Sequence, residues 1–121
     1  LSRVHLCRDS FTAMGLVLEA MASHGGALSE LRAEIPTYAM VHERLTCPAR
    51  DMAPCMRLLR DLYKGETLDL TDGVKVVWPD SWLQARPSTT EQILRIHAEA
   101  PTEEKAQAIL RQALDCLSPT L

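Results

Sequence analysis

The chain has 121 residues, of which 13 are Lys or Arg and 16 are Asp or Glu, so its formal charge is −3. This is the length of one small domain, and its 46% apolar and 24% charged residues are ordinary for a globular protein. The acidic balance argues against nucleic acid as a partner, and the longest apolar-rich run, residues 11–22, falls short of the ~20 residues that span a bilayer.

Residues 9–24 predict a helix that Asp9 or Ser10 caps and Gly25 ends. Its apolar residues continue almost all the way round, which is typical of a helix buried inside a larger protein. Neither an initiator Met nor a secretory signal precedes it. We therefore expect the chain to be a piece of a longer protein that covers this helix.

A short helical stretch over 28–35 stops at Pro36, so residues 36–38 are the expected linker to a first strand, 38–46. Residues 51–64 predict an amphipathic helix, because apolar and charged side chains occupy opposite faces, and Gly65 is its expected stop. The apolar stripe of this helix is interpreted as core packing.

From residue 67 the apolar period changes to two, which predicts an antiparallel meander with turns at 72–73 and 79–80. In its last strand, 93–99, one face carries Leu94, Ile96 and Ala98, and the other carries Arg95, His97 and Glu99. A closing helix follows, capped by Thr102. The predicted class is α+β: an antiparallel, mainly four-stranded sheet with two helices on one face, preceded by an extra N-terminal helix.

Four cysteines, Cys7, Cys47, Cys55 and Cys116, are widely spaced and contain no C-x-x-C pair. We interpret them as reduced thiols of a cytoplasmic protein. Because they and the four histidines do not lie at metal-ligand spacing, no metal site is expected in this chain.

The segment Arg86-Pro87-Ser88-Thr89-Thr90-Glu91 lies between two predicted strands. An arginine fork, hydroxyl donors and the backbone N–H groups of a tight turn together suit the oxygens of a phosphate. A polar turn capped by Ser and Thr is the alternative interpretation of the same residue types.

Residues 72–76, 82–91 and 93–100 together resemble the C-terminal domain of the α-D-phosphohexomutases, most closely phosphomannomutase/phosphoglucomutase. The chain departs from the family loop at Thr89, where Gly or Asn is usual, and at Gln92, where Pro is usual. A Cβ branch at Thr89 disfavours a left-handed backbone, and Gln92 loosens the exit of the loop.

Upstream, residues 8–24 are similar to the last helix of the family's third domain, and 28–38 to the passage into the fourth. The resemblance thus covers nearly the whole chain. It implies that residues 1–36 are the tail of the third domain with its linker, and that 37–121 are a C-terminal phosphate-binding domain.

The resemblance implies an enzyme, an isomerase that moves a phosphoryl group between the 1- and 6-positions of a hexose. Its phosphoserine, its Mg²⁺ loop and its sugar-reading loop would lie outside this chain, so we expect no catalytic residue, metal or cofactor here and an inactive fragment. Its partners would be the hexose phosphate and the missing N-terminal domains, with neither nucleic acid nor membrane.

By the same resemblance, the non-reacting phosphate of the substrate would bind to Arg86, Ser88, Thr89 and Thr90. Arg95 is a candidate for a secondary contact, although a solvated Arg on an open sheet face fits equally well. His97 is expected at the surface, and Lys75 has the same two interpretations as Arg95. The open alternatives are a phosphoglucosamine mutase domain and a standalone interaction or nucleic-acid-binding module of similar fold.

Overall fold

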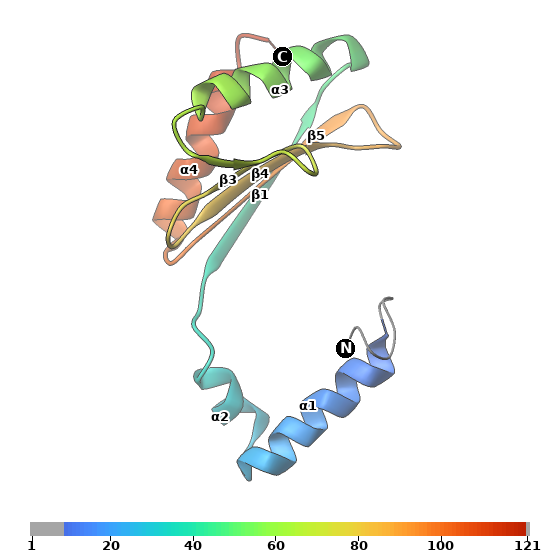
Figure 1. Ribbon diagram of the computed structural model, residues 1–121, viewed down its shortest axis with the longest axis vertical. Coiled ribbons are helices and arrows are strands. Elements are labelled where there is room, and N and C mark those ends of the chain that lie inside the picture. Colours follow the sequence, from blue (N-terminus) through green and yellow to red (C-terminus); the bar gives the residue numbers. More distant parts are fainter. Residues whose placement is uncertain (1–8, 121) are drawn as a thin grey trace. The chain divides into compact units, whose positions relative to one another are not determined.

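The computed structural model describes residues 9–120 and divides the chain into two compact units, Leu1–Pro36 and Thr37–Leu121. The first unit holds helices α1 (Ser10–His24) and α2 (Leu28–Ala33) (Figure 1). The Asp9 carboxylate caps α1 by accepting the backbone N–H groups of residues 11 and 12 at 3.0 and 3.2 Å. Gly25 ends the helix with φ 75°, so the predicted cap and stop are both confirmed.

Helix α1 leaves large apolar side chains in solvent. Phe11 is 86% exposed, and none of the helix's residues is buried. A hollow of about 350 Å³ on this unit is lined only by apolar side chains: Ala13, Met14, Val17, Leu18, Met21 and Leu28. Apolar surface that is contiguous in this way normally marks a contact with another protein surface.

We expect the purified chain to cover this face, either by self-association or by folding of α1 back onto its own chain. Sedimentation velocity and covalent footprinting of Phe11 and Met14 measure the two outcomes. Leu18→Glu should abolish association, whereas Glu19→Gln on the same helix should not. A monomer in which Phe11 and Met14 stay fully solvated contradicts this expectation.

The second unit is a five-stranded antiparallel sheet of order β1-β5-β4-β3-β2 with two helices (Figure 1). Its elements in chain order are β1 (Ala39–Thr46), α3 (Ala49–Leu62), β2 (Thr67–Asp69), β3 (Val74–Val77), β4 (Trp82–Pro87), β5 (Ile93–Ala100) and α4 (Glu103–Leu117). The predicted α+β class and the antiparallel meander are confirmed.

Three local predictions need correction. The sheet has five strands rather than mainly four, because residues 67–69 pair with β3 as a short edge strand. Leu70, which continues the period-two pattern that begins at residue 67, lies beyond the end of that strand and is half exposed. Helix α3 begins two residues earlier than predicted, since the Pro48 carbonyl accepts its first N–H groups, and it ends before Gly65, with Tyr63 as its C-cap.

The core lies between one face of the sheet and helices α3 and α4, which Figure 1 shows together on that face. In β5 the side chains alternate as predicted, with Leu94, Ile96 and Ala98 fully buried. Helix α4 is capped by the Thr102 hydroxyl, which accepts the Lys105 N–H at 3.3 Å. The opposite face of the sheet is polar, and it is there that the candidate residues lie.

The cysteines among the described residues form no disulfide. Cys47 and Cys55 are fully buried with their sulfur atoms 3.9 Å apart. Burial, helped by the neighbouring Cys47, raises the pKa of the Cys55 thiol to about 11, so it stays protonated. Cys116 is partly exposed, and Cys7 lies outside the described residues.

Candidate functional site

Arg86 lies in strand β4, not in the connecting loop as predicted from the sequence. Its Cα partner on the next strand is Arg95 of β5. Their neighbours Ala85 and Leu94 face the core, so the alternation of a strand places both arginines on the face away from the helices. The hairpin therefore sets two guanidinium groups side by side at its closed end.

The turn between these strands is built by Ser88. Its N–H donates to the Ile93 carbonyl at 2.9 Å, and its Oγ accepts the N–H groups of Thr90 and Glu91 at 3.4 and 3.3 Å. No non-glycine residue among those described has a positive φ, so Thr89 needs no left-handed conformation here. The departure at Thr89 is thus accommodated without backbone strain.

A hollow of about 120 Å³ lies where this turn meets the two arginines. It is lined by Asp72, Arg86, Pro87, Ser88, Thr89, Thr90 and Arg95. The structure therefore brings together all four residues of the predicted phosphate site and Arg95, the candidate for a secondary contact, and it adds Asp72. Asp72 was not identified from the sequence, because it was interpreted only as a turn residue. It precedes β3, the strand that pairs with β4, and its carboxylate lies beside Arg86.

Each arginine has one carboxylate partner. Arg86 Nη1 lies 3.0 Å from Asp72 Oδ2, and Arg95 Nη2 lies 3.0 Å from Glu91 Oε2. The two arginine side chains are 44% and 30% exposed, and ion pairs of this kind contribute about 0–1 kcal/mol. An incoming anion can therefore displace these carboxylates at small cost.

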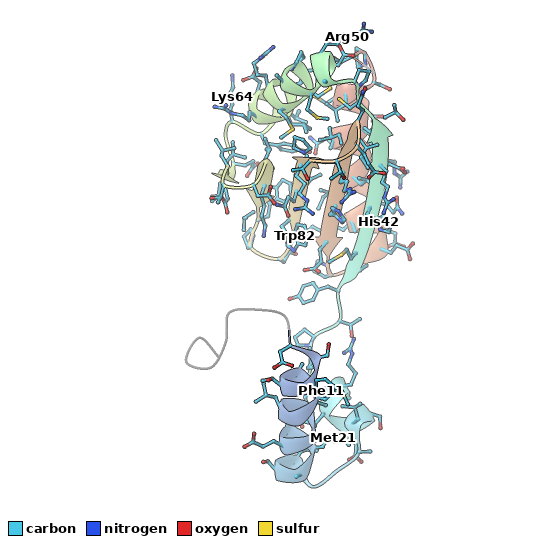
Figure 2. The ribbon with its side chains drawn as sticks, turned by 90° about the vertical axis from the view of Figure 1, so that its right-hand side faces the viewer. Phe11, Met21, His42, Arg50, Lys64 and Trp82 are labelled. Atoms are coloured by element: carbon cyan, nitrogen blue, oxygen red, sulfur yellow. The ribbon has the colours of Figure 1, made fainter. Side chains whose placement is uncertain are left out.

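The polar face of the sheet continues from this hollow onto β1. There Arg44 lies opposite Arg95, and His42 lies opposite His97. Figure 2 shows the position of His42 on β1. The two imidazole rings are stacked with centroids 5.9 Å apart. Burial lowers the pKa of His97 below its usual value, and the positive groups nearby lower it further.

Lys75 does not contact the hollow. Its Cα partner is Gln84, and its Nζ lies 4.9 Å from the centroid of the Trp82 ring. The Trp82 indole N–H donates to Glu99 Oε1 at 2.9 Å. Lys75 is thus held in a cation–π contact further along the polar face.

Within residues 9–120, no cluster of three or more His, Cys, Asp or Glu side chains is arranged to hold a metal ion. None of the helices in this range is both long and apolar enough to cross a membrane.

No protein-family model matches the chain. It is 38% identical over 116 residues to a protein named probable phosphoglucosamine mutase from Methanopyrus kandleri, which covers 93% of this chain and 25% of that protein. It is 34% identical to the protein of the same name from Pyrococcus furiosus, covering 90% and 25%. It is 33% identical to a phosphoglucomutase/phosphomannomutase from Thermococcus kodakarensis, covering 96% and 26%.

A crystal structure of a phosphoglucomutase/phosphomannomutase family protein from Burkholderia thailandensis superimposes with a TM-score of 0.61 at 20% identity. The match covers 78% of this chain and 20% of that protein, and it supports the fold. The chain spans about a quarter of the length of the curated relatives it matches. The chain is therefore homologous, over most of its own length, to about one quarter of the length of proteins named phosphoglucosamine mutase and phosphoglucomutase/phosphomannomutase.

Proposed function

We propose that this chain is the C-terminal, substrate-phosphate-binding domain of a cytoplasmic phosphohexomutase that interconverts hexose 1-phosphate and hexose 6-phosphate. The observation that carries the proposal is the cross-strand pair Arg86 and Arg95 beside the hydroxyl-rich turn. Planar guanidinium groups match phosphate oxygens, and charge-assisted hydrogen bonds are roughly twice as strong as neutral ones.

In this proposal the domain anchors the phosphate that does not react. Arg86 neutralises its charge, while Ser88, Thr89 and Thr90 donate from hydroxyl or backbone groups around the hollow. Anchoring one end of the sugar orients the other end toward the reacting group, and positioning of this kind lowers the barrier without breaking a bond.

The phosphoryl transfer itself is assigned to the rest of the parent protein. A phosphoserine and a bound Mg²⁺ would supply the nucleophile and the charge stabilisation there. The apolar face of α1 has a different proposed partner, the remainder of the third domain, because residues 8–24 resemble the last helix of that domain.

We expect the chain alone to show no mutase activity, because one anchoring site does not stabilise the charge that develops during phosphoryl transfer. A coupled assay of the conversion of glucose 1-phosphate to glucose 6-phosphate measures this directly. Turnover above the buffer rate that follows the protein through purification would overturn the assignment of catalysis to the missing part.

Titration with glucose 6-phosphate, followed by the shifts of backbone amides in NMR, tests the phosphate site itself. Shifts should concentrate on residues 86–91 and saturate on the order of millimolar, since a few charged hydrogen bonds must offset the entropy lost on binding. Added salt should weaken the binding. If unphosphorylated glucose shifts the same amides equally, the polar-turn interpretation holds instead.

A parent enzyme acting on hexosamine phosphates is the second candidate, because two of the three relatives described above are named phosphoglucosamine mutase. Glucosamine 6-phosphate and glucose 6-phosphate should bind this domain with similar affinity if the domain recognises only their phosphate group. A standalone nucleic-acid-binding module is the competing class of function. If the domain is such a module, single-stranded RNA should shift the NMR signals of backbone amides in the sheet.

A further inference from the structure

Three arginines from three neighbouring strands stand in one row on the polar face. Arg44 of β1 is the Cα partner of Arg95 of β5, which is in turn the partner of Arg86 of β4. Side chains opposite each other on neighbouring strands are about 5 Å apart at Cβ, and like charges in such pairs destabilise a sheet. A row of this kind costs stability unless something negative binds to it.

The carboxylates nearby balance this row only in part. Asp72 pairs with Arg86 and Glu91 with Arg95, while no carboxylate among the described residues pairs with the guanidinium of Arg44. One positive charge is therefore left uncompensated beside the hollow at the turn. An anion with two negative charges would relieve the repulsion along the row.

The stacked histidines form the adjacent row. His42 and His97 are cross-strand partners with ring planes inclined by 27°, and Gln84 lies on the other side of His97. Charged or titratable groups lie around His97 on four strands: His42 and Arg44 on β1, Arg95 and Glu99 on β5, Arg86 on β4 and, further along, Lys75 on β3. Lys75 lies over the ring of Trp82, and Glu99 accepts the indole N–H of Trp82.

These surroundings favour the neutral form of His97 in the free protein. Burial is the largest cause of its lowered pKa, followed by His42 and then by the three arginines of the row. A bound dianion would cancel the repulsion from those arginines. The proton affinity of the imidazole should then rise.

We propose that Arg44 and the His42–His97 pair extend the phosphate site, and that a phosphate-type dianion bound at Arg86 and Arg95 draws one proton from solvent onto His97. This inference rests on the proposed function, because it needs an anion at the two arginines. The proposal adds Arg44 and His42 of β1 to the groups that contribute to anion binding. It also makes the affinity of the domain for the anion depend on pH.

The sign of this dependence follows from linkage. Because binding raises the proton affinity of His97, the affinity for the dianion increases as the pH falls through the titration of bound His97, and it levels off below that of free His97. A difference of about one pKa unit between the two states corresponds to roughly tenfold tighter binding at the acidic end. Sugar phosphates take up a proton themselves near pH 6, whereas sulfate keeps both charges.

The test is therefore a sulfate titration of the full chain between about pH 5.5 and 8, with the imidazole signals of each histidine followed by NMR. In the parent sequence sulfate should bind more tightly at low pH and should move the titration of His97 upward. The imidazole signals of His24, whose Nδ1 lies 3.6 Å from Glu34 Oε1, should not move when sulfate is added, and they serve as the internal control.

The double variant His42→Gln and His97→Gln should still bind sulfate but lose the pH dependence, and His24→Gln should retain it. Arg44→Ala should weaken binding several-fold at every pH. If sulfate binds equally well across the range, or if the double variant keeps the dependence, the histidine contribution is wrong while the phosphate site stands. If sulfate and sugar phosphates both fail to bind at any pH, the proposed function fails and this inference fails with it.

Discussion

Replacing Gly73 by Ala should lower the free energy of unfolding by at least about 2 kcal/mol. Gly73 turns the chain between β2 and β3 with φ 84°, in the left-handed region that L side chains rarely adopt. A Cβ built on it would collide with the carbonyl oxygen of Ala85 and would lie 3.0 Å from the Cα of Arg86. Both atoms belong to the backbone of β4, so neither can rotate away.

Urea unfolding followed by circular dichroism measures the effect. Gly65→Ala is the matched control, because nothing lies within 4 Å of a Cβ at that position and its φ is not left-handed. That variant should change stability by less than about 1 kcal/mol. Equal stability of the two variants would show that the turn at Gly73 is not packed against β4 as described.

Replacing Arg86 by Ala should weaken the binding of glucose 6-phosphate by about tenfold or more, because a charge-assisted hydrogen bond is worth roughly 1.5–3 kcal/mol. Arg95→Ala should cost less. Its side chain is 30% exposed against 44% for Arg86, so it offers less surface to an incoming anion. Because Arg86 stands at the exposed end of β4, its removal leaves the core residues in place.

The measurement is an NMR titration of both variants at low salt, with glucose 6-phosphate and glucose compared. Arg50→Ala is the control for a general loss of positive charge, since Arg50 lies on α3 and is largely exposed. It should bind like the parent sequence. If Arg86→Ala binds the sugar phosphate as well as Arg50→Ala does, the phosphate site is assigned to the wrong residues.

Short-range sequence signals predicted the helices and strands well wherever those signals are strong. The side chains of Asp9 and Thr102 cap α1 and α4 as expected, because a cap depends on residues only two or three positions away. The alternation in β5 identified the buried face of that strand for the same reason. The edge strand β2 was less clear, since only three residues pair and their pairing depends on β3.

The sequence by itself determined the helices, the alternating strands and the group of phosphate-binding residue types at 86–90. Only the tertiary structure decided that Arg86 lies in a strand opposite Arg95, that Asp72 lies beside it, and that Arg44 comes from a strand some fifty positions away in the chain to stand in the same row. The physical reason is that cross-strand neighbours are selected by the register of backbone hydrogen bonds between distant segments, which no local pattern specifies.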